Sequence, residues 1–172
     1  MSGSVEAWER ICRGHKGWDL RLLLVGTGED AEELRRRIAV MQLRGVLWVN
    51  EFVHDRATIR RYLSAADIYA FPSRHEGFAV SPLEGMGCGL PVVAADAQGV
   101  PDMLEGGEVS GGLIVPRGNA AELALALGRL LDDVAWSREL GKRARCRVEA
   151  SFSLEVVGRQ LRAFLFNGRS EN

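Results

Sequence analysis

Two carboxylates, Glu76 and Glu84, stand with seven residues between them in a segment that follows a strand-like stretch. Gly77 lets another group approach the backbone closely, and the pair Ser81 and Pro82 is typical of a helix start. An ionised carboxylate only accepts hydrogen bonds, so a hydroxyl-bearing or cationic ligand suits these acids. Open α/β proteins bind ligands beyond the carboxyl ends of their strands. The segment therefore predicts a ligand site.

The two acids differ in whether a structural role could explain their presence without a ligand. Glu84 comes three residues after Ser81 and could close a capping box with it, which would satisfy the local hydrogen bonds without any ligand. Both interpretations of Glu84, helix cap and ligand contact, stay open on spacing alone. Glu76 has no evident partner in the sequence, which favours a ligand for it.

The elements that must position these acids alternate along the chain. Short apolar or β-branched runs alternate with amphipathic stretches, which is typical of a parallel sheet covered by helices on both faces. Asp55 and Asn119 are the expected caps of two helices, and Pro72 marks the exit from a strand. Helices at about 135–150 and 154–166 make the C-terminal third helical. The fold class is α/β, with strands expected at 20–26, 46–50, 67–72, 91–95 and 112–115.

The N-terminal helix has an unusual place in this order. It is expected at about residues 4–13 and leads straight into the strand at 20–26. A parallel βαβ unit begins with a strand, so this helix is the crossover of a unit whose first strand does not appear. We therefore expect one strand of the sheet to be missing.

The composition excludes several classes of partner. The 172 residues carry a net charge of -1 and a sequence pI of about 6.3, so no broad basic field exists for nucleic acid or anionic membranes. The apolar runs are strand-sized and no signal core follows Met1, so a cytoplasmic location is expected. The cysteines lack metal-ligand spacing and favour reduced thiols. They are Cys12, Cys88 and Cys146.

A glycine pair after the first strand suggests a different ligand. Gly26 and Gly28 loosely fit a dinucleotide fingerprint, with Glu51 near the place of a ribose-binding acid. Glu29 and Asp30, however, put negative charge where a pyrophosphate would need free amides and the positive end of the helix dipole. A tight turn is the favoured interpretation, and an NAD-binding Rossmann domain is the lesser alternative.

The segment from Glu76 to Ala94 resembles the E-G-F-G…E-A-M-A-x-G-x-P-V-V-A signature of retaining family 4 glycosyltransferases of the GT-B fold. Further matches stand in the same order at 25–29, 66–73, 99–102 and 112–116. These linked motifs are far more specific than the glycine pair. The resemblance covers roughly residues 15–168 and implies a Rossmann-like donor-binding domain, with residues 1–172 forming a single domain.

The resemblance implies a role for each residue of the signature. Glu76 would be the catalytic candidate, facing the donor sugar near the transferred carbon, and Glu84 would accept hydrogen bonds from both ribose hydroxyls. The strand-end region 50–53, which includes Phe52, would border the nucleobase, largely through its backbone, and Arg74 would offer charge to a phosphate. The donor would be a UDP- or GDP-sugar, and the family needs no metal or other cofactor. The implied donor-binding residues are Gly77, Phe78, Ala79, Val80, Glu84, Phe52 and Arg74.

Some positions depart from the family pattern. Ala79 replaces a glycine, and Gly85 and Gly87 replace alanines, so the residues beside the acids remain small. Glycine lowers the intrinsic stability of a short helix by roughly 1 kcal/mol relative to alanine. We therefore expect these glycines to allow close packing of the helix on the sheet. Asp102 stands where Glu is commoner, and Leu154 where Trp is usual.

The family also carries upstream parts that these residues do not show. They are a central strand, a phosphate loop with Arg and Lys, and an N-terminal domain for the acceptor sugar or lipid-linked glycan. Without them we expect a marginally stable fragment that is inactive alone. The implied activity is retaining hexosyl transfer in bacterial polysaccharide or glycolipid synthesis, compatible with peripheral membrane association of a full-length enzyme. The alternative is a nucleotide-sugar-binding module or a truncated remnant without turnover.

Overall fold

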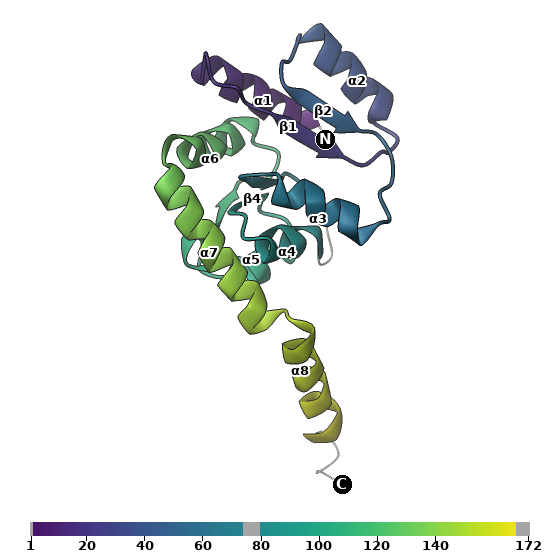
Figure 1. Cartoon of the computed structure of the whole chain (residues 1–172), viewed down its shortest axis with the longest axis vertical. Helices are drawn as coiled ribbons and strands as arrows, with labels where there is room; N and C mark the ends of the chain where they lie inside the picture. The colour runs from purple at the N-terminus through teal and green to yellow at the C-terminus, as the bar shows by residue number, and fades with distance from the viewer. Residues whose placement is uncertain (1, 74–79, 168–172) are drawn as a thin grey trace.

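The computed structural model describes residues 2–73 and 80–167 and has an α/β fold. Figure 1 shows its strands enclosed by helices, with the last helix projecting from the body. All strand pairs are parallel. The described strands are β1 (Leu22–Val25), β2 (Val46–Val49), β3 (Tyr69–Phe71), β4 (Val92–Ala95) and β5 (Gly112–Val115). Each lies inside its expected range, so the predicted fold class is confirmed.

Helices alternate with these strands, as the sequence predicted. Asp55 accepts hydrogen bonds from the amides of Ala57 and Thr58, and Asn119 accepts them from Ala121 and Glu122, so both predicted caps are confirmed. The helices are α1 (Ser2–Gly14), α2 (Ala31–Val40), α3 (Arg56–Ser64), α4 (Val80–Gly87), α5 (Val100–Met103), α6 (Ala120–Asp132), α7 (Val134–Ser151) and α8 (Leu154–Asn167). A short 3-10 helix, η1 (Gly107–Ser110), precedes β5.

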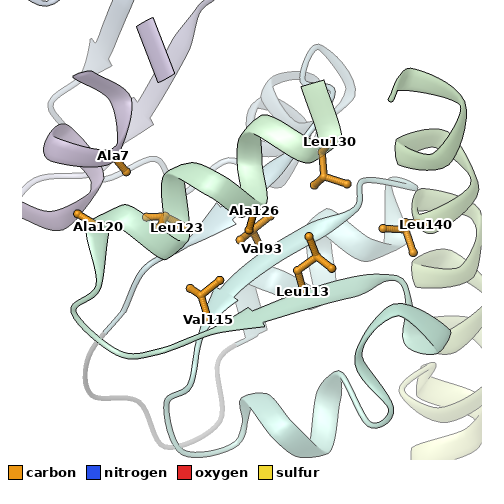
Figure 2. Packing of buried hydrophobic residues seen from close by; sticks show 9 residues of the cluster. All are labelled: Ala7, Val93, Leu113, Val115, Ala120, Leu123, Ala126, Leu130 and Leu140. Carbon is orange, nitrogen blue, oxygen red and sulfur yellow. The ribbon is translucent and has the colours of Figure 1, made fainter. Parts of the chain in front are cut away.

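The core lies on both faces of β4, in which every residue is buried. Val93 belongs to one cluster with α6, whereas Val92 and Ala94 belong to a second cluster with α4 and α5. Figure 2 shows the first cluster, in which side chains of α6 lie over β4 and β5. Successive side chains of a strand point to opposite faces, so β4 needs apolar residues at every position. Helices on both faces of the sheet are thus confirmed.

The strands do not form one continuous sheet. Strands β1 and β2 pair with each other, and β3, β4 and β5 form a second sheet in that order. No ladder joins the two sheets among the described residues. This break agrees with the expectation that one strand is missing from an otherwise parallel sheet.

Helix α1 connects the two sheets. Ala7 packs in the cluster formed by α6, β4 and β5. On the other side, the indole Nε1 of Trp8 donates a hydrogen bond to the carbonyl of Arg44, 3.0 Å away and just before β2. His15 Nε2, beyond the end of α1, lies 3.0 Å from a carboxylate oxygen of Asp132 at the end of α6. These contacts hold the β1–β2 pair beside the larger sheet.

The C-terminal helix has little contact with the rest of the molecule. Helix α8 extends away from the body beyond α7 (Figure 1), and Leu154 and Phe164 on it are 89% and 78% exposed. In the part of the chain that the structure describes, no helix has both the length and the apolar character needed to cross a membrane.

Candidate functional site

The predicted junction between β3 and α4 is present in the structure. Strand β3 ends at Phe71 and α4 begins at Val80. This places the junction at the carboxyl end of a parallel strand, where open α/β proteins bind ligands. Several predicted site residues lie outside the described residues, namely Arg74, Glu76, Gly77, Phe78 and Ala79. Their predicted roles remain predictions.

Glu84 presents an unengaged carboxylate on α4. Its side chain is exposed, and neither a hydrogen bond nor an ion pair to it is found among residues 2–73 and 80–167. The helix begins at Val80, so Ser81 lies within the first turn instead of before it. A capping box needs the serine in front of the helix, and the predicted box is therefore wrong. Without that local partner, the ligand interpretation of Glu84 gains weight.

The start of α4 also offers backbone donors. The first N–H groups of a helix have no acceptor within it, and Val80 and Ser81 are the first two residues of α4. Both side chains are exposed, whereas Pro82 is buried. The positive end of the helix dipole adds to this attraction for an anion. The role predicted for the Val80 amide, which is to face the diphosphate, stays a prediction.

Helix α4 is held in place by close packing. A Cβ atom on Gly85 would lie 3.0 Å from Cγ and Cδ2 of the Tyr69 ring on β3. On the other side, a Cβ on Gly141 of α7 would lie only 2.1 Å from the carbonyl oxygen of Gly89. The predicted close packing is therefore confirmed at Gly85. It is wrong at Gly87, where a Cβ would meet no atom within 4 Å.

Two rings lie beyond the carboxyl end of β2. Phe52 is 72% exposed, and its ring stacks on that of His54 at a centroid distance of 6.2 Å and an interplanar angle of 20°. The resemblance described above implied a place beside the nucleobase for Phe52. The structure pairs Phe52 with His54, which the spacing of two residues could have suggested. The two rings follow β2, whereas Glu84 follows β3. The strands that lead to the rings and to Glu84 therefore lie in different sheets.

The glycine pair after β1 forms a turn at an acidic helix start. Gly26 has φ of 120°, which favours glycine, and its carbonyl accepts a 3.0 Å hydrogen bond from Trp48 Nε1. Exposed Glu29 and Asp30 precede α2, and Glu32 and Glu33 occupy its first turn. All four acids complement the helix dipole. Glu32 and Glu33 also pair with Arg35 and Arg36, whereas Glu29 and Asp30 would repel a pyrophosphate.

Arg117 is a cation at the strand ends that sequence analysis missed. Its Nε and Nη2 donate hydrogen bonds of 2.9 and 2.7 Å to the backbone carbonyl of Asp96. The pair joins the turn after β5 to the end of β4. The sequence offers one indication of this role, because Arg117 stands two residues after the fifth strand, among residues typical of turns.

Two hollows mark the surface of the described residues. A small cavity of about 20 Å³ lies at the carboxyl ends of β3, β4 and β5. A larger hollow of about 530 Å³ lies between η1 and α7, at the amino end of β5, and its charges are engaged in ion pairs such as Arg147–Glu105 and Arg143–Glu139. The larger hollow is lined by Cys146 but by none of the predicted donor-binding residues that the structure describes.

Metal ligands and thiols give no second site in the part of the chain that the structure describes. No group of three or more His, Cys, Asp or Glu side chains could hold a metal ion there. The three cysteines are free thiols, and burial raises the pKa of Cys12 above its usual value of 9.0.

Comparison with known proteins places the chain in a family. The family described as "Glycosyl transferases group 1" matches residues 3–133. A GDP-mannose-dependent monoacylated alpha-(1-6)-phosphatidylinositol monomannoside mannosyltransferase of Corynebacterium glutamicum is 32% identical over 150 residues, which are 83% of this chain and 38% of that protein. The amylovoran biosynthesis glycosyltransferase AmsK of Erwinia amylovora is 34% identical over 148 residues, covering 83% and 36%.

Solved structures agree with this placement. Sucrose-phosphate synthase from Thermosynechococcus elongatus superposes with a TM-score of 0.78 at 32% identity, covering 95% of this chain and 41% of that one. The C-terminal domain of a group 1 glycosyl transferase, LpcC from Francisella tularensis, gives a TM-score of 0.77 at 21% identity and covers 88% and 78%, which shows the shared fold. The chain spans between a third and two fifths of the curated relatives named here. It belongs to the group 1 glycosyl transferases.

Proposed function

We propose that this chain binds the nucleoside-diphosphate sugar donor of a hexosyltransferase that retains the anomeric configuration. The observation that carries the proposal is the exposed carboxylate of Glu84 on α4, which has no hydrogen bond or ion pair among residues 2–73 and 80–167. A carboxylate there can accept hydrogen bonds from two neighbouring hydroxyl groups, as a ribose presents. The first amides of the same helix are suited to the diphosphate. One short helix thus offers groups for both parts of a nucleotide.

The family relatives support a sugar nucleotide as the ligand. The relative from Corynebacterium glutamicum is named for its dependence on GDP-mannose. We assign the donor sugar to Glu76 and the amides of Gly77, Phe78 and Ala79, and a phosphate to Arg74. Departure of a nucleoside diphosphate leaves negative charge that preorganised N–H groups stabilise. In this proposal the reaction proceeds without a metal ion.

The activity of the whole protein extends the proposal. Relatives named for the synthesis of a phosphatidylinositol mannoside and of amylovoran support a glycolipid or polysaccharide acceptor. The acceptor would bind to parts outside these 172 residues, so we expect the chain alone to bind the donor without turning it over. A cytoplasmic location, where nucleotide sugars are at hand, and peripheral membrane association of a full-length enzyme belong to the same proposal.

Calorimetric titration of the chain with UDP and GDP tests the donor site. We expect one of them to bind, and Glu84→Ala to weaken that binding at least tenfold. Glu155→Ala is the matched control, because Glu155 is also an exposed acid near a helix start, on α8. It should leave the affinity unchanged. Equal affinities for wild type and Glu84→Ala, or no binding of either nucleotide by folded protein, would refute the role of Glu84.

A further inference from the structure

The guanidinium of Arg117 completes the sheet at the carboxyl ends of β4 and β5. Ala95 stands opposite Val115 in the register, and the amide of Asp96 donates a 2.8 Å hydrogen bond to the carbonyl of Val115. In a parallel ladder the carbonyl of Asp96 would accept from the amide two positions further along β5, which is that of Arg117. The side chain of Arg117 supplies this contact through Nε and Nη2, at 2.9 and 2.7 Å. Arg117 therefore fixes the point at which β4 ends.

The turn between β4 and α5, residues 96–99, is held on both sides and is called the β4–α5 turn below. Ala97 is only 1% exposed and packs in the cluster that includes α4 and α5. The amide of Val100 donates a 3.1 Å hydrogen bond to the carbonyl of Ala97. By contrast, Asp96 and Gln98 are exposed. The turn is thus a fixed frame that presents two polar side chains to solvent.

The β4–α5 turn borders the junction that leads to Glu84. Phe71 stands opposite Ala94 in the register of β3 and β4. Two residues further along each chain, Ser73 at the exit of β3 is level with Asp96 at the exit of β4. Neighbouring strands lie about 4.7–4.9 Å apart, so a ligand that extends over more than one strand end from this junction reaches the turn.

The β4–α5 turn suits one part of a nucleoside-diphosphate sugar better than the others. A diphosphate would meet the carboxylate of Asp96, which repels it and offsets the charge of Arg117. A base stacks on aromatic rings, and residues 96–99 contain none. The hydroxyl groups of a sugar donate and accept hydrogen bonds, and so does the side-chain amide of Gln98, while the carboxylate of Asp96 accepts them. The sugar is therefore the part that fits the turn.

We propose that the β4–α5 turn contacts the sugar of the donor through Asp96 and Gln98, and that Arg117 is the positioning residue that holds the turn. The inference rests on the proposed function of the chain as the donor-binding part of a hexosyltransferase. It adds to that function a surface that recognises the sugar separately from the nucleotide. Arg117 acts through its two hydrogen bonds to the carbonyl of Asp96 and not through a contact with the sugar.

Calorimetric titration can compare each sugar nucleotide with its own nucleotide, namely UDP-glucose with UDP and GDP-mannose with GDP. For the pair that the chain binds, Gln98→Ala should weaken binding of the sugar nucleotide relative to the nucleotide by about fivefold or more, the usual effect of one lost hydrogen bond. Asp96→Asn keeps the backbone carbonyl and should act in the same direction. Gln160→Ala, at an exposed glutamine on α8, is the control and should leave the ratio unchanged.

Two substitutions test the positioning role of Arg117. Arg117→Ala removes both hydrogen bonds to the Asp96 carbonyl and should weaken binding of the sugar nucleotide but not of the nucleotide. Arg117→Lys keeps a donor for that carbonyl and should restore part of the affinity. In NMR spectra, the side-chain amide of Gln98 should shift with the sugar nucleotide and not with the nucleotide alone. This response should be lost in Arg117→Ala.

The possible results separate this inference from the proposed function. Equal losses of affinity for nucleotide and sugar nucleotide in Arg117→Ala would overturn the proposal, as would unchanged ratios in Gln98→Ala and Asp96→Asn. In each case nucleotide binding by wild type would leave the donor site standing. A shift of the Gln98 amide with free glucose or mannose would assign the turn to an acceptor sugar and also overturn the proposal. Failure of folded wild type to bind any of the four compounds would overturn the donor site and this inference with it.

Discussion

Gly85 of α4 lies directly against the ring of Tyr69 on β3. A Cβ atom added to Gly85 would approach two ring carbons to 3.0 Å, closer than ordinary contacts between side chains. The helix that carries Glu84 is thereby seated on the strand that precedes it. The position of α4, and of Glu84 on it, depends on this absence of a side chain.

The substitution Gly85→Ala should destabilise the fold. Alanine has the better helix propensity, but the new methyl group must displace the Tyr69 ring, and overpacking of this kind costs about 1–3 kcal/mol. We expect a lower midpoint of urea unfolding, together with weaker nucleotide binding because Glu84 shifts with its helix.

Gly87→Ala is the matched control in the same helix. A Cβ there meets no atom within 4 Å, so the better helix propensity should raise stability by up to about 1 kcal/mol. If Gly85→Ala proved as stable as Gly87→Ala, the close approach of α4 to Tyr69 would not describe the folded protein.

The cap of α3 predicts a dependence of stability on pH. Hydrogen bonds from the side chain of Thr58, and then from the amides of Thr58 and Ala57, lower the pKa of Asp55 below its usual value of 3.8. A lowered pKa means that Asp55 stabilises the fold above pH 3.8, and that this contribution is lost as pH falls through the folded-state pKa. Asp55→Ala should therefore lower the thermal midpoint at pH 7, and the difference from wild type should shrink in acid.

Asn119→Ala provides the control for that titration. Asn119 caps α6 through its side-chain oxygen and carries no titratable group. Its loss should cost about 1 kcal/mol, the usual value of such a cap, at neutral and acid pH alike. A deficit of Asp55→Ala that persists below the folded-state pKa would show that something other than the carboxylate charge stabilises α3.

Local signals in the sequence were sufficient for much of the fold. Asp55 and Asn119 cap helices because an N-cap depends on a side chain two or three residues from the amides that it accepts. The strands were found because buried parallel strands are apolar throughout, as β4 is. Ser81 failed as a cap because α4 already includes Val80, which puts Ser81 within its first turn.

Contacts between distant residues could not be predicted in the same way. Nothing local distinguishes Gly85 from Gly87, since only the folded chain brings Tyr69 beneath one of them. The hydrogen bonds from Arg117 to the carbonyl of Asp96 likewise join residues 21 positions apart. The break between β1 and β3 was expected only in outline, because its place depends on how α1 packs against α6.

NAD should not bind to the glycine turn after β1. Exposed Glu29 and Asp30 directly precede α2 and would repel the pyrophosphate, whereas Glu32 and Glu33 pair with Arg35 and Arg36. In a calorimetric titration we expect no heat of binding from NAD. NAD binding that is abolished by Gly26→Ala and unaffected by Glu84→Ala would instead establish the dinucleotide site.

Phe52→Ala should weaken nucleotide binding without destabilising the fold. The ring is 72% exposed and held over His54, so it offers a flat apolar face for a base at the end of β2. Stacking of a base on an aromatic ring contributes about 1–3 kcal/mol, which corresponds to roughly 5–150-fold in affinity.

His54→Ala should weaken nucleotide binding less than Phe52→Ala, since it removes only the ring that stacks on Phe52. Phe164→Ala, at a similarly exposed ring on α8, is the control and should leave the affinity for UDP and GDP unchanged. Equal affinities for Phe52→Ala and Phe164→Ala would remove the two rings from the donor site and restrict that site to α4 and the strand end before it.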